Sequence, residues 1–134
     1  MTDSTLELTK KLVGAQSISP ADAGCQTLIA EYLKQLGFKV EPMPFADVSN
    51  LWATHGEGAP YFTFAGHTDV VPSGPLEDWD TDPFEPTVVD GHLYGRGTAD
   101  MKGSIAAMLT ATRNFLSQHS DHKGTLAFLI TSDE

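Results

Sequence analysis

The chain has 134 residues, 40% of them hydrophobic and 19% charged, which is typical of one globular domain. Its formal net charge of −10 argues against nucleic acids and anionic membranes as partners, because both are bound mainly through lysine and arginine. The only cysteine, Cys25, excludes an internal disulfide and a cysteine-rich zinc site. Charged residues interrupt the apolar pattern of the N-terminal segment, and no apolar run approaches the roughly 18 residues of a membrane span. We therefore expect a cytoplasmic protein.

Two helical patterns occupy the first part of the chain. Apolar residues recur at helical spacing between residues 3 and 15 and predict an amphipathic helix. After an interruption at residues 17–20, a second apolar stripe predicts a helix with Ser19 as its N-cap, Pro20 in its first turn and Gly37 at its end. The stripe consists of Cys25, Leu28, Ile29, Tyr32, Leu33 and Leu36.

Extended segments follow these helices. Residues 39–45 contain two prolines, which cannot donate to a strand ladder, so this segment is predicted to be an edge strand or an extended connection. Residues 50–54 and 126–130 are predicted strands. The second of these is apolar on both faces, which is typical of a central strand flanked by others.

The middle of the chain combines an irregular loop with a hairpin. Residues 71–86 are rich in proline and lack periodicity, and such long loops are usually functional or mobile. Trp79 and Phe84 are expected to fix this loop to the surface. Residues 87–94 predict a β-hairpin, because Asp90 and Gly91 accept the positive φ angles of a two-residue turn.

A glycine-containing segment, residues 95–103, leads into a helix predicted at residues 103–118. Its glycines do not follow a strand in the spacing of a nucleotide-binding fingerprint. Asp100 lies just before the helix, where the positive end of the helix dipole favours a carboxylate. His119 and His122 flank a polar stretch after the helix, which predicts a solvated loop rather than a zinc site.

The clearest functional signal comes where two predicted strands end. The apolar run from Tyr61 predicts a buried strand that stops at His67 and Asp69, and residues two apart project to the same side. Such a pair alone is also compatible with ordinary hydrogen bonding at a strand end. Strands connected through helices are normally parallel, so the strand before Glu134 should end at the same edge, where α/β sheets bind ligands.

We therefore expect an α/β fold whose mixed, largely parallel sheet is flanked by helices, with a cluster of polar residues at one edge. The residues expected to converge there are His67, Asp69, Asp100 and Glu134. One imidazole with several carboxylates is typical of a catalytic site for zinc or a similar divalent ion. A glutamate just outside the metal ligands could act as a base toward water.

Three segments resemble the zinc-dependent deacylases and exopeptidases, a family that includes aminoacylases, acetylornithine deacetylases and succinyl-diaminopimelate desuccinylases. These segments are Phe64–Pro72, Tyr94–Gly103 and Leu129–Glu134. Shorter details are most similar to the desuccinylases, namely residues 17–20, 50–53, 83–86 and 94–97. Thr98 departs from the desuccinylase pattern, because alanine or serine is expected there in desuccinylases, whereas threonine is common in the acetylornithine enzymes. The resemblance implies a zinc-exopeptidase-like catalytic domain.

The resemblance also implies roles for the four residues. His67 would bind one zinc ion, Asp100 would bridge two, Asp69 would orient His67, and Glu134 would be the general base. The implied cofactors are two Zn²⁺ ions, one of them replaceable by Co²⁺, and the peptide bond between Asp100 and Met101 is expected to be cis. The implied reaction is hydrolysis of an N-acyl amino acid, removing succinate from N-succinyl-LL-2,6-diaminopimelate in lysine biosynthesis.

Further metal ligands and a dimerising lid domain follow the position of Glu134 in that family. We therefore expect residues 1–134 to be the N-terminal part of a metallohydrolase catalytic domain, marginally stable and inactive alone, whose complete protein is a homodimer. Two alternatives stay open: an acetylornithine deacetylase or aminoacylase of the same family, and a non-catalytic interaction fragment.

Overall fold

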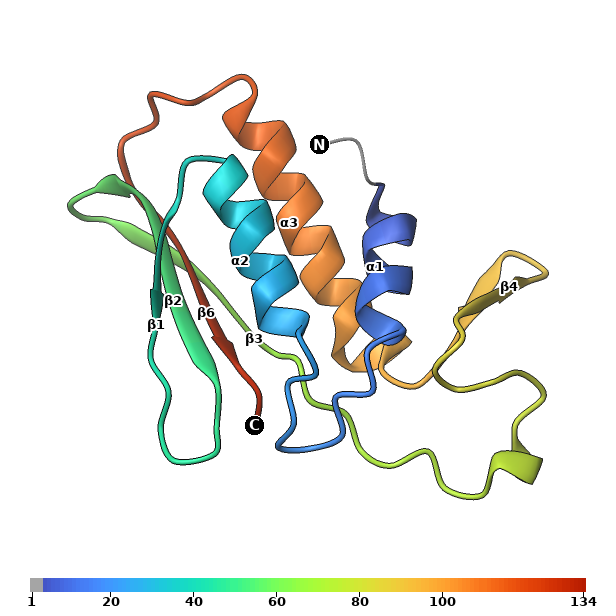
Figure 1. Cartoon of the computed structure of the whole chain (residues 1–134). Coiled ribbons are helices and arrows are strands. Elements are labelled where there is room, and N and C mark those ends of the chain that lie inside the picture. The colour runs from blue at the N-terminus through green and yellow to red at the C-terminus, as the bar shows by residue number, and fades with distance from the viewer. Residues whose placement is uncertain (1–3) are drawn as a thin grey trace.

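The computed structural model describes residues 4–134 as a four-stranded sheet with three helices packed on one face (Figure 1). In spatial order the strands are β1 (Lys39–Pro42), β2 (Asn50–Glu57), β6 (Gly124–Thr131) and β3 (Tyr61–His67). The helices are α1 (Thr5–Val13), α2 (Cys25–Gln35) and α3 (Gly103–Leu116). A separate hairpin, β4 (Thr87–Val89) with β5 (His92–Tyr94), and two short helical turns, Leu76–Asp78 and Thr98–Lys102, complete the described elements.

The pairing of the strands brings two of their C-terminal ends together. β3 and β6 are parallel, with His67 opposite Thr131, as predicted. β1 pairs with β2 and β2 with β6 in antiparallel fashion. The sheet is therefore mixed, but with less parallel pairing than the sequence suggested. The consequence for function is that residues following β3 and β6 emerge at one edge.

The core lies between this sheet and the helices. Phe128 and Ile130 of β6 are fully buried, as are Ile105 and Leu109 on α3. The ring of Phe128 packs against Phe38 at a centroid distance of 5.7 Å. Burial of each such side chain contributes about 1.5–3 kcal/mol to folding. This packing fixes the end of β6 relative to the start of α3, the two places that carry Glu134 and Asp100.

The start of the second helix differs from its prediction. α2 begins at Cys25, with Gly24 as its N-cap at a φ of 85°, so Ser19 is not the cap. The reason is tertiary: the Ser19 hydroxyl donates to the Asp69 carboxylate, and its N–H donates to the carbonyl of Val70 at 3.0 Å. These bonds hold the chain against the end of β3, away from the helix axis.

The strand β3 is also less buried than predicted. Tyr61 and Phe62 are each 59% exposed, because in residues 4–134 β3 pairs only with β6 and forms the edge of the sheet. β6, in contrast, has a partner on each side, as expected of a central strand. The side of β3 that faces away from β6 is therefore an exposed edge of the sheet, with unpaired backbone N–H and C=O groups.

The hairpin and the preceding loop agree with the sequence pattern. Asp90 and Gly91 have φ angles of 51° and 78°, which form the predicted turn between β4 and β5. Residues 71–86 are irregular apart from one short helical turn. The indole of Trp79 donates to the carbonyl of Ser73 at 3.0 Å, and the Arg96 guanidinium lies 5.2 Å from the indole ring centre. Trp79 thus fixes the loop, as expected.

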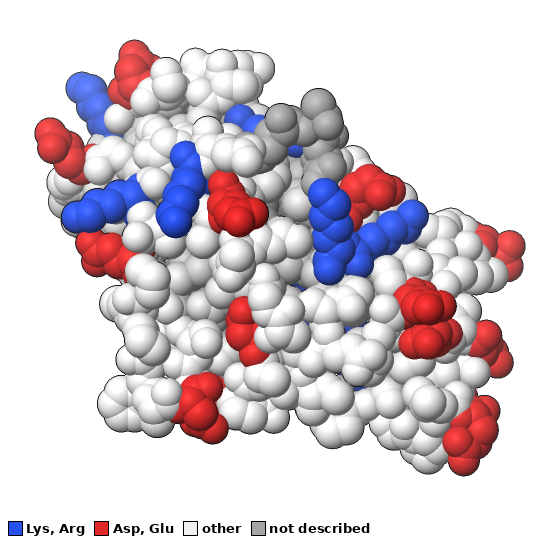
Figure 2. Space-filling view, viewed as in Figure 1, with Lys and Arg blue, Asp and Glu red and all other residues white. Residues whose placement is uncertain are grey.

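Figure 2 shows acidic side chains on both sides of the molecule, on the side of β1 as well as on the side of the hairpin. The segment from Val71 to Tyr94 contains acidic residues without lysine or arginine. Its acidic residues are Glu77, Asp78, Asp80, Asp82, Glu85 and Asp90.

In the part of the chain that the structure describes, no helix is long and apolar enough to cross a membrane.

His122 has a partner that the sequence did not indicate. Its Nε2 lies 2.8 Å from Nδ1 of His55 on β2, and the His55 ring packs against Phe38 at 5.3 Å. Burial, and then the charge of a protonated His122, lower the pKa of His55 below its ordinary value of 6.5. The pair therefore favours a neutral His55 in the folded state.

We expect this pair to make the folded state pH-sensitive. Because the folded-state pKa of His55 is depressed, the unfolded chain binds the proton first, and stability falls as the pH drops below about 6.5. Thermal unfolding near pH 7.5 and near pH 5.5 should show a smaller drop in Tm for His55→Gln than for the unmodified chain. Equal drops would show that His55 titrates alike in both states.

Candidate metal centre

His67 stands at the end of β3 with its ring buried. Its Nδ1 lies 2.9 Å from the backbone carbonyl oxygen of Asp69. A carbonyl oxygen can only accept, so Nδ1 carries the proton of this hydrogen bond. The other nitrogen, Nε2, therefore faces the edge of the sheet, which is the orientation of a metal-binding imidazole.

Asp100 reaches this edge from a turn that runs directly into α3. The turn, Thr98–Lys102, is closed by a hydrogen bond of 2.8 Å from the Lys102 N–H to the carbonyl of Gly97. Gly97 has a φ of 89°, and a Cβ there would lie 2.6 Å from Val70, so glycine is required. The Asp100–Met101 peptide bond is cis, as the resemblance implied. Asp100 projects from the turn with 80% of its side chain exposed.

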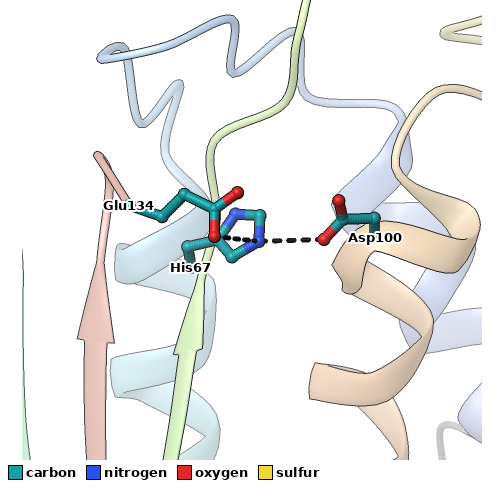
Figure 3. A group of neighbouring side chains, drawn as sticks. All are labelled: His67, Asp100 and Glu134. Carbon is teal, nitrogen blue, oxygen red and sulfur yellow. Dashed lines mark hydrogen bonds and ion pairs between the residues drawn. The ribbon is translucent and has the colours of Figure 1, made fainter.

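Glu134 completes the group from the other side, just beyond β6. Figure 3 shows its carboxylate and that of Asp100 on either side of the His67 ring. The Nε2 atom lies 3.0 Å from Oδ1 of Asp100 and 3.5 Å from Oε2 of Glu134. The three potential ligand atoms all lie within 4.8 Å of one another. We call these three residues the edge cluster.

The surroundings of His67 favour a positive charge on its ring. Burial works to lower the pKa of His67, but hydrogen bonds to the Asp69 carbonyl and to Asp100, with the charges of Glu134 and Asp69, raise it above 6.5. A metal ion that bound Nε2 would have to displace a proton from this nitrogen. The same negative groups that stabilise the proton would stabilise a divalent cation in its place.

Asp69 lies against the opposite side of the same ring. Its side chain is buried, and one carboxylate oxygen, Oδ1, lies 3.3 Å from Nδ1 of His67 and has no hydrogen-bond partner among the described residues. The other oxygen, Oδ2, accepts from Ser19. The backbone carbonyl of Asp69 is therefore the nearer acceptor for the ring, and its carboxylate adds negative charge beside it.

The edge cluster opens into a cavity of about 490 Å³. His67, Asp100 and Glu134 line one part of this cavity, and the segment Gly95–Ala99 lines another. One imidazole nitrogen with carboxylate oxygens is a donor set that suits zinc and related divalent ions. The residues present therefore fit a metal ion, with room beside it for a small ligand.

All four residues predicted from the sequence lie at this edge, but three neighbours were not anticipated. The sulfur of Met101 lies 3.4 Å from the backbone nitrogen of His67 and accepts its hydrogen bond. Lys102 is fully buried and donates to the carbonyl of Ala15 at 2.9 Å, which ties the Asp100 turn to the end of α1. Ser19 had been interpreted as a helix cap. Spacing alone carries no signal for these contacts, which join segments far apart in the chain.

Comparison with known proteins identifies relatives of this fold. Residues 63–134, which include the edge cluster and Asp69, match the model of peptidase family M20/M25/M40. Human carnosine dipeptidase 1 is 28% identical, with a TM-score of 0.81 over 94% of this chain and 31% of its own. An M20 family metallo-carboxypeptidase from Sulfolobus solfataricus, 23% identical, has a TM-score of 0.84 over 96% of this chain and 30% of its own.

A zinc-dependent exopeptidase from Parabacteroides distasonis shares the fold more distantly, with 15% identity and a TM-score of 0.62 over 96% of this chain and 45% of its own. The chain thus spans less than half the length of each of these proteins. The family model, however, covers more than half of the chain itself. The chain therefore belongs to peptidase family M20/M25/M40.

Proposed function

We propose that this chain supplies part of the active site of a zinc-dependent amide hydrolase. The observation that carries the proposal is the edge cluster, in which one imidazole and two carboxylates from three separate segments meet beside a cavity. Membership of a peptidase family supports hydrolysis of an amide bond. The names of two structural relatives, a metallo-carboxypeptidase and a zinc-dependent exopeptidase, support a metal and favour zinc.

In this proposal His67 and Asp100 would hold the metal, and Asp100 would serve both of two zinc ions, one of which cobalt could replace. Bound zinc supplies a more acidic water and polarises the acyl carbonyl of the substrate. Glu134 accepts a proton from the attacking water and passes it to the leaving amine nitrogen. Asp69 keeps the proton of His67 on Nδ1, so that Nε2 stays free for metal.

The proposed substrate is N-succinyl-LL-2,6-diaminopimelate, which is cleaved to succinate and the free amine in lysine biosynthesis. Its support is the resemblance of residues 17–20, 50–53, 83–86 and 94–97 to desuccinylases. This activity, a cytoplasmic location and a homodimeric state are proposed for the complete protein, because the chain covers only 31% of its dipeptidase relative. Dipeptide cleavage is a second candidate, favoured by the name of that relative.

Zinc titration of the 134-residue chain tests the proposed centre. Calorimetry should detect binding that is lost in His67→Ala and retained in His92→Ala, since His92 is an exposed residue of the hairpin. Absence of zinc binding, both here and in a longer chain, would instead support a non-catalytic interaction fragment.

A substrate panel on the complete protein tests the finer proposal. Succinyl-diaminopimelate should be hydrolysed with a higher kcat/KM than acetylornithine, other N-acetyl amino acids or dipeptides. A preference for acetylornithine or for dipeptides would support the proposed hydrolase activity but contradict the proposed desuccinylase specificity.

A further inference from the structure

A loop between α1 and α2 holds the segment that carries His67 and Asp69. Residues 17–22 lie along residues 67–70, although the two stretches are about 50 positions apart in sequence. Their contacts are Ser17 Oγ to the Thr68 carbonyl at 2.6 Å, Val70 N–H to the Ser17 carbonyl at 2.8 Å, Ser19 N–H to the Val70 carbonyl at 3.0 Å, Thr68 Oγ1 to Asp22 at 2.7 Å, and Ser19 Oγ to Asp69.

Within this set, the Ser19 hydroxyl is the group that contacts the Asp69 carboxylate. It donates to Oδ2, while Oδ1 of the same carboxylate lies 3.3 Å from Nδ1 of His67. Asp69 is only 4% exposed, so water competes little for either oxygen. Fixing one oxygen of a planar carboxylate also fixes the direction of the other, so the position of Ser19 determines how Asp69 meets His67.

We propose that Ser19 is a positioning residue of the metal centre. Its hydroxyl holds the Asp69 carboxylate beside Nδ1 of His67, at 3.3 Å, while the backbone carbonyl of Asp69 accepts the ring proton, and together these groups keep Nε2 directed at Asp100 and Glu134. This inference rests on the proposed function, because it assigns Ser19 a role toward the metal that the edge cluster would bind. Ser19 also lines the cavity beside that cluster.

The effect of the Ser19 hydroxyl can be tested separately from the backbone contacts that hold the loop against Val70. The backbone bond from Ser19 to Val70 and the strand-like bridge between Ile18 and Val70 do not involve the Ser19 side chain. Removing the hydroxyl therefore leaves these backbone contacts in place but frees the carboxylate to rotate. Loss of such an outer partner lowers metal affinity by roughly 10- to 100-fold.

The test measures zinc affinity in the 134-residue chain by calorimetry. Ser19→Ala should weaken binding by about 10-fold, at the lower end of the range for outer-shell partners. Ser19→Thr should bind as the unmodified chain does, whereas Ser19→Val, of the same shape without the hydroxyl, should behave like Ser19→Ala. Ser17→Ala is the matched control, because Ser17 belongs to the same loop and its hydroxyl donates to the backbone carbonyl of Thr68 instead of to the Asp69 carboxylate. Thermal unfolding without zinc verifies that each variant is folded.

A double-mutant cycle shows whether Ser19 acts through Asp69. If it does, Ser19→Ala should weaken zinc binding no further once Asp69→Asn is present. Additive losses, or an equal loss in Ser17→Ala, would overturn the positioning role and leave Ser19 as a structural residue. Equal affinity of the Thr and Val variants would also overturn it, even if the alanine variant failed to fold. Absence of zinc binding by the unmodified protein, in this chain and in a longer one, would instead overturn the proposed metal centre on which this inference rests.

Discussion

Replacing Glu134 with alanine in the complete protein is expected to lower kcat by roughly 10²- to 10⁴-fold, the contribution of a general base. Its zinc content should stay close to that of the unmodified protein. Glu134 projects into the cavity with 64% of its side chain exposed, and its Oε2 is farther from His67 Nε2, at 3.5 Å, than the Asp100 oxygen, at 3.0 Å. A base toward water needs such access to the cavity, whereas the metal is proposed to be held by other groups.

The measurement combines kcat with metal analysis of the purified protein. Glu134→Gln, which keeps the shape of the side chain but cannot accept the proton, should be as slow as the alanine variant. Glu85→Gln on the exposed loop should keep the full rate. If Glu134→Ala lost zinc as completely as a variant of Asp100, Glu134 would be a metal ligand and the assigned roles would be wrong.

Replacing Asp100 with alanine is expected to lower zinc affinity by more than the roughly 10- to 100-fold that loss of an outer-shell partner costs. Asp100 is proposed to be shared by two ions, so its removal takes a negative ligand from both. The same carboxylate is one of the groups that raise the pKa of His67, so it stabilises positive charge on the ring.

Calorimetric zinc titration of Asp100→Ala beside Asp133→Ala provides the comparison. Asp133 lines the same cavity but stands outside the edge cluster, so its removal should change zinc affinity little. Equal losses of affinity in both variants would mean that zinc affinity depends on the total charge of the cavity. That outcome would reject Asp100 as a specific ligand.

Much of the fold follows from local patterns in the sequence. The apolar periodicities of α1 and α3 and the Asp90–Gly91 turn depend on residues close together in the chain, and these elements appear where they were predicted. The convergence of His67 and Glu134 was also predictable, because a helical crossover makes β3 and β6 parallel and so places their ends at one edge.

Only the tertiary structure decided the surroundings of that edge. Local rules assigned Ser19 to a helix cap, yet its hydroxyl bonds Asp69 about 50 residues away. Local rules also predicted a buried β3, but exposure depends on which elements pack beside a strand, and β3 has a partner on one side only. Side-chain chemistry and short-range periodicity can be read along the chain. Contacts between distant segments depend on how the whole chain packs, and those contacts bring Ser19, Asp100 and Glu134 to the end of β3.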